Sequence, residues 1–491
     1  MITKNKWILL LIITPILLIL VACGNSSIDS EKQMRSSNVK PTATKQSVMK
    51  PQVKPTATKQ SVMKESNNKT KILEKRTPTI FSTPDSYNDF PKNIQDKFKN
   101  IVDAEFSELS EKAGISVAVY TDGILWTYSS GKASDSAEMT QNTPLMISST
   151  SKTFLSALIL TQVEKGLYKL SDPIESVLYD HPDFSSFDTT KINTQVTVDN
   201  LLKMSSGLAN YSKNMQGMSD LIKMPVLKQI DLIDLIQSPY DEPGSFEYND
   251  TNVVLLGMIA ELHSGKPLAE LYRTTFYNPL SITAITLPEE GIAWHPEIFK
   301  DSGDNLTLPN MAMPYTDISM WGSGFGNMID AAPFGFGYYI GAMGRTRYAC
   351  CGIISTPQNI ARWAYHLYSP NGLAISESVR IQLKNSTSPT RIPPWSSSKM
   401  PGQIPAEYGY LVSMKKFQTH NSKTPITTAY GHPGGGSGYS GTMHYSTELD
   451  LSISIITNFQ IKVLGTCGTD GPGNCITSKI FKTYNDHLYS K

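Results

Sequence analysis

Apolar, β-branched runs separated by turn sequences predict β-strands near both ends of the long folded part of the chain. Residues 115–120 and 124–128 are two such runs, and Asp122-Gly123 between them is typical of a tight hairpin turn. Residues 439–445 and 451–456 flank a short polar stretch and predict a second hairpin. We therefore expect one hairpin near each end of the folded region.

Longer apolar runs between the two hairpins predict helices. Lys152 to Glu164 precedes Gly166, and Thr251 to Leu262 precedes Gly265; glycine after an apolar run commonly ends a helix. Ile476 to Tyr489 predicts a C-terminal helix that covers one face of the sheet. The order indicates an α+β fold: an antiparallel sheet built from both termini and flanked by helices, with an inserted, mainly helical region.

The N-terminal residues 1–23 have the layout of an export signal. Lys4 and Lys6 precede an apolar run from Trp7 to Val21, and small residues lead to Cys23. The end of this segment resembles a bacterial lipobox, which implies a lipidated Cys23 as the mature N-terminus. The alternative is an uncleaved membrane anchor, although the run is shorter than the roughly 20 residues of a spanning helix. Either reading places the chain in the cell envelope, outside the cytoplasm and held on a bacterial membrane.

Residues 24–85 predict a disordered basic linker. They are rich in Ser, Thr, Lys and Pro, carry twelve Lys and Arg against five Asp and Glu, and contain one segment twice, as Val39 to Lys50 and as Val53 to Lys64. Such a composition cannot bury a core. Residues 86–491 form the expected folded domain. The net charge of +1 over the whole chain argues against a nucleic-acid partner.

The cysteines after residue 23 suggest one disulfide. Cys467 and Cys475 flank a turn-rich loop that brings them together, and an exported location permits the bond. Cys350 and Cys351 are adjacent, so a bridge between them, reduced thiols and pairing elsewhere all stay open. The irregular, Gly- and aromatic-rich residues 291–344 predict either a lid or a packed loop.

Candidate chemistry starts at Ser149 and Lys152. The chain has no G-x-S-x-G elbow, H-E-x-x-H pair or phosphate-binding glycine loop, so we expect neither cofactor nor metal. Ser149-Thr150-Ser151-Lys152 opens an apolar run, consistent with a buried helix that starts at the serine and places Lys152 beside its hydroxyl. A buried amine loses its proton more easily and can serve as a base toward Ser149. The alternative is that Ser149 only caps a helix.

Two further motifs extend this pattern. Tyr248-Asn249-Asp250 precedes one predicted helix, and His432-Pro433-Gly434 with Gly435 precedes the C-terminal hairpin. With these, the chain resembles the serine penicillin-recognising enzymes: class C β-lactamases, DD-peptidases, and their esterase and aminopeptidase relatives, whose motifs are S-x-x-K, Y-x-N and [KH]-x-G in that order. The resemblance extends from about Gly114 to Asn458.

The resemblance implies a role for each motif residue. Ser149 is the nucleophile that forms an acyl-enzyme, and Lys152 helps to remove its proton. Tyr248 is a second acid/base whose phenol pKa is lowered by neighbouring cations. His432 lines the opposite wall and orients the substrate or Tyr248. The amides of Ser149 and Gly435, with Gly434 beside them, form the oxyanion hole.

Three positions depart from the family pattern. Asp250 stands where Asn is usual, and it either pairs with Lys152 or caps the helix from Thr251. Pro433 stands where many relatives have Thr, whose hydroxyl binds the substrate carboxylate. Cys350-Cys351 replaces small residues near the cleft, as structural cysteines or with a redox effect on the site.

The leading functional hypothesis is a D-alanyl-D-alanine carboxypeptidase or related D-amino-acid peptidase. Its partners would be peptide or small acyl substrates, such as peptidoglycan stem peptides, and the membrane through the lipid anchor. The alternatives are an esterase or class C β-lactamase-like hydrolase of small acyl substrates, and a non-hydrolytic penicillin-binding sensor. His432 in place of Lys favours a peptidase, esterase or aminopeptidase over an efficient β-lactamase.

Overall fold

The computed structural model describes most of the chain after residue 79. The described residues are 80–82, 86–107, 113–134, 136–221, 224, 227–287, 311–312, 315–317, 328–330, 346, 348–396, 404–418, 425–436, 438–460, 466–467 and 471–489. The expected export signal with Cys23, nearly all of the linker, and most of residues 291–344 lie outside them. Within this set, the helices are too short or too polar to cross a membrane.

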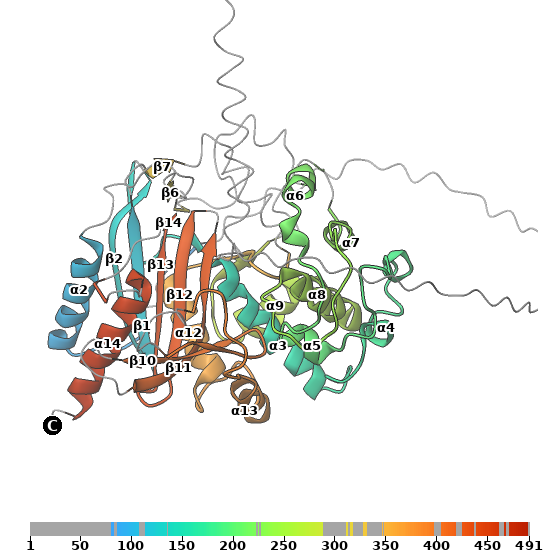
Figure 1. The fold of residues 1–491 in the computed structure, drawn as a ribbon. Coiled ribbons are helices and arrows are strands. Elements are labelled where there is room, and N and C mark those ends of the chain that lie inside the picture. The colour runs from blue at the N-terminus through green and yellow to red at the C-terminus, as the bar shows by residue number, and fades with distance from the viewer. Residues whose placement is uncertain are drawn as a thin grey trace, which may run out of the picture.

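One antiparallel sheet of eight strands forms the centre of the fold, in the order β3-β2-β1-β13-β12-β11-β10-β9. Both predicted hairpins are present in it, as β1 with β2 and as β12 with β13, and β1 pairs with β13 so that Ile115 lies opposite Thr457. The expectation of a sheet built from both termini is therefore confirmed (Figure 1). The strands are β1 (Gly114–Thr121), β2 (Ile124–Ser134), β3 (Ala137–Glu138), β9 (Glu407–Tyr408), β10 (Ser413–Gln418), β11 (Pro425–Gly436), β12 (Tyr439–Ser446) and β13 (Leu451–Thr457).

Helices cover both faces of this sheet, and its strands β1 and β13 are buried along their whole length. In β1, Ile115, Val117 and Val119 belong to the core cluster that contains residues of α2 (Lys92–Phe106) and α14 (Pro472–Tyr489). Ala118 and Tyr120 point to the other cluster, which contains α12 (Pro357–Tyr368). The predicted C-terminal helix thus covers one face, beside α2 (Figure 1).

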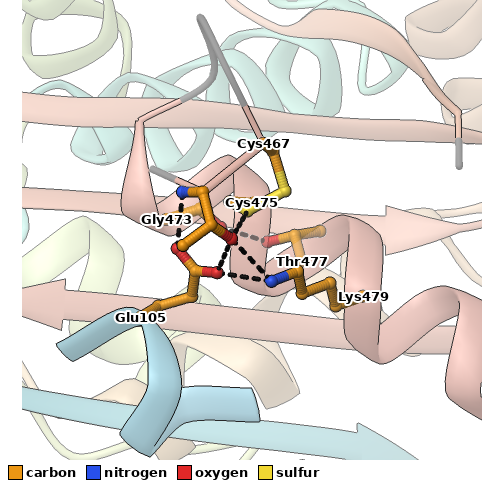
Figure 2. Close-up of a disulfide and its surroundings, with 7 residues drawn as sticks. Glu105, Cys467, Gly473, Cys475, Thr477 and Lys479 are labelled. Carbon is orange, nitrogen blue, oxygen red and sulfur yellow. Dashed lines mark hydrogen bonds and ion pairs between the residues drawn. A yellow bond between two sulfur atoms is a disulfide. The ribbon is translucent and has the colours of Figure 1, made fainter. Parts of the chain in front are cut away.

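A disulfide joins Cys467 to Cys475 at the start of α14, as the turn-rich loop between them predicts. Nearby, Glu105 of α2 accepts hydrogen bonds from Lys479 Nζ (2.5 Å) and the Thr466 amide (3.0 Å), which ties the two helices together (Figure 2). These hydrogen bonds outweigh burial and lower the pKa of the Glu105 carboxyl. The disulfide therefore belongs to a structural contact between α2 and α14.

The inserted helical region packs beside the sheet (Figure 1). Its two central helices, α3 (Lys152–Glu164) and α8 (Asp250–Ser264), match the predicted ones and contact each other. Gly265 ends α8 in the left-handed conformation, at φ 67°. The other helices are α4 (Ile174–Val177), α5 (Val198–Leu202), α6 (Met215–Leu221), α7 (Gln229–Ile233), α9 (Leu268–Tyr272), a π-helical turn (Arg273–Tyr277) and α13 (Glu377–Asn385).

A small sheet fixes the segment that leads into α3. It runs β4 (Leu145–Met146), β8 (Ile353–Ser355), β5 (Ala284–Thr286), and the Ile147 amide donates to the Ile353 carbonyl (3.0 Å). A second small sheet comprises β14 (Phe459–Gln460), β6 (Tyr315–Asp317) and β7 (Met328–Asp330). Phe81, in the expected linker, is buried in the main core, so contacts with the folded domain begin before residue 86.

Candidate active site

Ser149 lies in a tight turn at the entrance to α3. A 3₁₀ turn covers Ser148–Ser151, and the α-helix begins at Lys152 rather than at the serine as we expected. Ser148 has φ 48°, in the left-handed region that non-glycine residues seldom adopt, so the backbone bends sharply before Ser149. The residue at the helix N-cap is Ser151, so Ser149 is not the cap of α3.

Lys152 lies directly beside the Ser149 hydroxyl, as the S-x-x-K spacing predicts. Its Nζ donates a hydrogen bond of 3.1 Å to Ser149 Oγ. Ser149 is 7% exposed and Lys152 is fully buried, which removes the amine from water. The hydroxyl and the amine are therefore in contact in a desolvated site.

Asp250 pairs with Lys152 and does not cap α8. Its Oδ1 lies 2.9 Å from Lys152 Nζ, and both side chains are almost completely buried. The cap is Asn249, whose side chain accepts a hydrogen bond of 2.8 Å from the Thr251 amide. Of the two roles that we left open for Asp250, the structure supports the ion pair.

This ion pair overturns the expected protonation of Lys152. Burial by itself would lower the pKa of the amine, but the Asp250 carboxylate, with smaller contributions from Cys351 and Tyr248, holds that pKa well above its ordinary value. The expected base role followed from burial alone, and the pairing with Asp250, one of the two roles left open for that carboxylate, reverses it. In the resting site Lys152 is therefore an ammonium ion.

Tyr248 faces Lys152 from the start of α8, with a pKa that differs from our expectation. The Lys152 Nζ lies 5.0 Å from the centroid of the Tyr248 ring. Burial raises the pKa of the Tyr248 phenol, and the nearby ammonium offsets only part of that rise. The predicted lowering is wrong because desolvation of the phenolate outweighs the attraction of one cation. Tyr248 is a neutral phenol in the resting site.

His432 projects from β11 toward the same cluster. Its backbone carbonyl accepts a hydrogen bond of 3.1 Å from Thr150 Oγ1, which ties β11 to the nucleophile turn, the 3₁₀ turn Ser148–Ser151 that carries Ser149. Burial and then the charge of Lys152 lower the pKa of His432 to about 3, so the ring is neutral. Its Nδ1 lies 2.6 Å from the Pro433 carbonyl, which can only accept; Nδ1 therefore carries the proton, and Nε2 accepts from the Tyr408 hydroxyl at 3.0 Å.

Two glycines of β11 lie beside the nucleophile turn with different steric demands. A Cβ at Gly434 would come within 2.1 Å of the Ile147 carbonyl oxygen, whereas a Cβ at Gly435 would meet nothing within 4 Å. Gly434 thus allows β11 to approach the backbone that carries Ser149. That approach is what the predicted pairing of the Ser149 and Gly435 amides requires.

Two aromatic residues outside the three motifs, Trp395 and Tyr408, pack around Tyr248 and His432. The Trp395 ring lies 4.9 Å from Tyr248 and 5.1 Å from His432, centroid to centroid, and is 37% exposed. Tyr408 is fully buried behind it. Sequence analysis missed both residues, because an isolated Trp in a loop and a Tyr in a two-residue strand give no signal of their place in the fold.

Cys351 also belongs to this cluster. Its Sγ lies 3.5 Å from Ser149 Oγ and 3.7 Å from Lys152 Nζ. Cys350 and Cys351 are not in a disulfide, and together with Asp250 they offer three ligand atoms within 4.8 Å of one another. The ammonium of Lys152 already lies against Asp250 and Cys351, so this group holds the protein's own cation.

Seven predicted residues thus gather at one place: Ser149, Lys152, Tyr248, Asp250, His432, Gly434 and Gly435. Cys467 and Cys475 lie elsewhere, at α14. A serine in contact with an ammonium–carboxylate pair, flanked by a neutral phenol and a neutral imidazole, has the parts for acyl transfer through a covalent serine intermediate.

Comparison with known proteins agrees with this arrangement. The chain is 30% identical to penicillin-binding protein 4* of Bacillus subtilis over 188 residues. These aligned residues make up 35% of this chain and 38% of that relative. A second match, to a putative penicillin-binding protein PbpX of the same organism, is 28% identical over 146 residues, which make up 29% of this chain and 33% of that relative. The chain thus spans between 33% and 38% of the length of these relatives.

Solved structures show the same fold. A D-amino acid amidase from Ochrobactrum anthropi SV3, complexed with L-phenylalanine, superposes with a TM-score of 0.60 at 18% identity and covers 81% of this chain and all of its own. An octameric penicillin-binding protein homologue from Pyrococcus abyssi superposes with a TM-score of 0.57 at 20% identity, over 81% of this chain and 77% of its own.

The family model described as Beta-lactamase matches residues 102–463, which include every member of the cluster around Ser149. That segment is well over half of the chain and holds the central sheet and the inserted helices. The chain therefore belongs to the beta-lactamase family and has the beta-lactamase and transpeptidase-like fold.

Proposed function

We propose that this protein hydrolyses amides and short peptides of D-amino acids, outside the cytoplasm, through an acyl-enzyme on Ser149. The observation that carries the proposal is the buried contact of Ser149 Oγ with Lys152 Nζ at 3.1 Å, which Asp250 completes at 2.9 Å. A serine needs an adjacent base to become a nucleophile at neutral pH. This cluster contains the groups that such a base requires.

The base is the Lys152–Asp250 pair acting together. Lys152 passes one proton to Asp250 across 2.9 Å, and the neutral amine then takes the Ser149 proton as Oγ attacks the substrate carbonyl. Substrate that closes the site against water favours this step, because a neutral pair is easier to bury than two charges. The neutral Tyr248 phenol gives its proton to the leaving amine and recovers one from Lys152.

The amides of Ser149 and Gly435 stabilise the oxyanion of the tetrahedral intermediate. Removing one such donor typically costs about 3 to 4 kcal/mol of transition-state stabilisation. Water then attacks the acyl-enzyme, with the same groups working in reverse. The product acid leaves, and Ser149 regains its proton.

The D-amino-acid substrate class rests on two observations. The partly exposed Trp395 places an aromatic surface beside Tyr248, which suits a substrate with an apolar side chain. The amidase from Ochrobactrum anthropi SV3, whose structures hold phenylalanine or its amide, has the same fold. Pro433 supplies no hydroxyl for a terminal carboxylate, which favours amides over D-alanyl-D-alanine and keeps an esterase as the second candidate.

Turnover measurements on the full-length protein and its Ser149→Ala variant test the proposal. The substrates are D-phenylalanine amide, L-phenylalanine amide, a D-alanyl-D-alanine peptide and a p-nitrophenyl ester. We expect Ser149-dependent cleavage with a preference for the D-amide. Cleavage of the ester alone would refute the amidase assignment, and a stable adduct without product would identify a binder.

We also propose that Cys23 anchors the protein to a bacterial membrane by a lipid, with residues 24–85 as the linker. The lipobox-like end of the signal supports this proposal. Labelling cells with a palmitate analogue should mark the wild type, and Cys23→Ala should abolish the label. A label that persists in the variant would contradict the anchor.

A further inference from the structure

The thiol of Cys351 touches the nucleophile and its base. Cys351 Sγ lies 3.5 Å from Ser149 Oγ and 3.7 Å from Lys152 Nζ. Like its buried neighbour Cys350, it is not in a disulfide. The proposed mechanism leaves Cys351 without a role.

The space next to Ser149 Oγ is the space that a substrate carbonyl must enter. Any group bonded to Cys351 Sγ begins within a few ångströms of the attacking oxygen, because the sulfur is already 3.5 Å from it. A reacting carbonyl must come to about 3 to 3.5 Å of the nucleophile, and displacements of about 1 Å are enough to cost rate on the order of 100-fold. A substituent on this sulfur therefore blocks acylation.

The same geometry makes Cys351 the reactive member of the cysteine pair. A cation near a sulfur stabilises the thiolate, which is the form that attacks electrophiles; the Lys152 ammonium lies 3.7 Å from Cys351 Sγ. Cys350 is fully buried, and desolvation, followed by its hydrogen bond with Cys351, raises the pKa of its thiol well above the ordinary value. Cys351 is 3% exposed and contacts Ser149, whereas Cys350 is 0% exposed, so we expect a small reagent that enters the site to meet Cys351 before Cys350.

We propose that Cys351 is a modification site through which small thiol-directed electrophiles switch off the enzyme reversibly. With a methyl thiosulfonate the Cys351 thiolate attacks the sulfenyl sulfur, an S–S bond forms, methanesulfinate leaves, and the thiol proton goes to water. Excess dithiol restores the thiol by exchange and releases methanethiol. The inference rests on the proposed role of Ser149 as nucleophile.

The test uses full-length wild type, Cys351→Ala and the matched control Cys350→Ala. Each is treated with methyl methanethiosulfonate, its remaining activity is compared with that of its own untreated sample, and peptide mapping by mass spectrometry locates the label. We expect wild type and Cys350→Ala to lose activity on the order of 100-fold with label on Cys351, and to recover with dithiothreitol. Treated Cys351→Ala should keep the same activity as untreated Cys351→Ala.

A second measurement does not depend on the activity of the variants. Wild type acylated beforehand at Ser149 should take up label at Cys351 more slowly than free enzyme, because the acyl group fills the same space. Absence of label on Cys351, full activity of the labelled enzyme, or equal inactivation of Cys351→Ala would each overturn the proposal. Loss of the Ser149 role is a separate result, seen as activity that survives in Ser149→Ala.

Discussion

Asp250→Ala should destabilise the protein far more than the loss of a surface carboxylate. The substitution leaves the Lys152 ammonium buried without its partner, where the side chains are 0% and 2% exposed. At 2.9 Å and an effective dielectric constant of about 20, the attraction between the charges is about 6 kcal/mol. Loss of one partner from buried pairs costs about 3 to 5 kcal/mol, and we expect a value in that range.

Two further variants calibrate this loss. Asp250→Asn removes the negative charge but keeps a polar oxygen near Lys152 Nζ, so we expect a smaller cost of about 1 to 3 kcal/mol. Glu247→Ala removes an exposed carboxylate from the same segment; it pairs with Lys213 at 2.8 Å with both side chains 53% exposed. A pair of that kind contributes at most about 1 kcal/mol.

The contribution of the Lys152–Asp250 pair to the stability of the wild type should be independent of pH near neutrality. The pKa of Lys152 is raised above its unfolded value of 10.5 in the folded state, so its contribution is fully present below that value and is lost only as pH rises through the folded pKa. Urea unfolding followed by tryptophan fluorescence at about pH 6 and pH 9 measures both effects. A cost below about 1 kcal/mol, or one equal to that of Glu247→Ala, would refute the ion pair as the basis of the site.

Three other predictions test separate parts of the site. Gly434→Ala should slow acylation at least about ten-fold, because its Cβ would lie 2.1 Å from the Ile147 carbonyl oxygen. Gly435→Ala should acylate at a rate closer to wild type, because its Cβ would meet nothing within 4 Å, and stopped-flow measurement of acylation compares the two variants. Trp395→Ala should raise KM for D-phenylalanine amide about ten-fold with little change in kcat, and an unchanged KM would contradict its contact with substrate. The imidazole signals of His432, assigned by comparison with His432→Gln, should not titrate by NMR between about pH 5 and pH 8, because burial holds its pKa near 3.

The sequence predicts much of this fold because the evidence is local. Each predicted hairpin combines two apolar runs with a turn, and α3 and α8 are each followed closely by a glycine with positive φ. The motifs around Ser149, Tyr248 and His432 then identify which of these elements meet. Local pattern and motif order are therefore sufficient to place the candidate nucleophile among its neighbours.

What the sequence does not predict depends on distances between separate elements. Whether Asp250 pairs with Lys152 or caps α8 is decided by Asn249, which takes the cap and leaves the carboxylate to point at α3. The protonation of Lys152 follows from that contact. The pKa of Tyr248 depends on how deeply other segments bury it, which no spacing within its own motif reveals.

The account is tested most directly by intact-mass analysis of the full-length protein after mixing with a fluorescent penicillin or a p-nitrophenyl ester. Ser149 Oγ, held 3.1 Å from Lys152 Nζ, should form one covalent acyl adduct per chain, and peptide mapping should place it on Ser149. The adduct should be absent from Ser149→Ala. An adduct that persists in Ser149→Ala, or turnover of any acyl substrate by that variant at the wild-type rate, would contradict the assignment of Ser149 as the nucleophile.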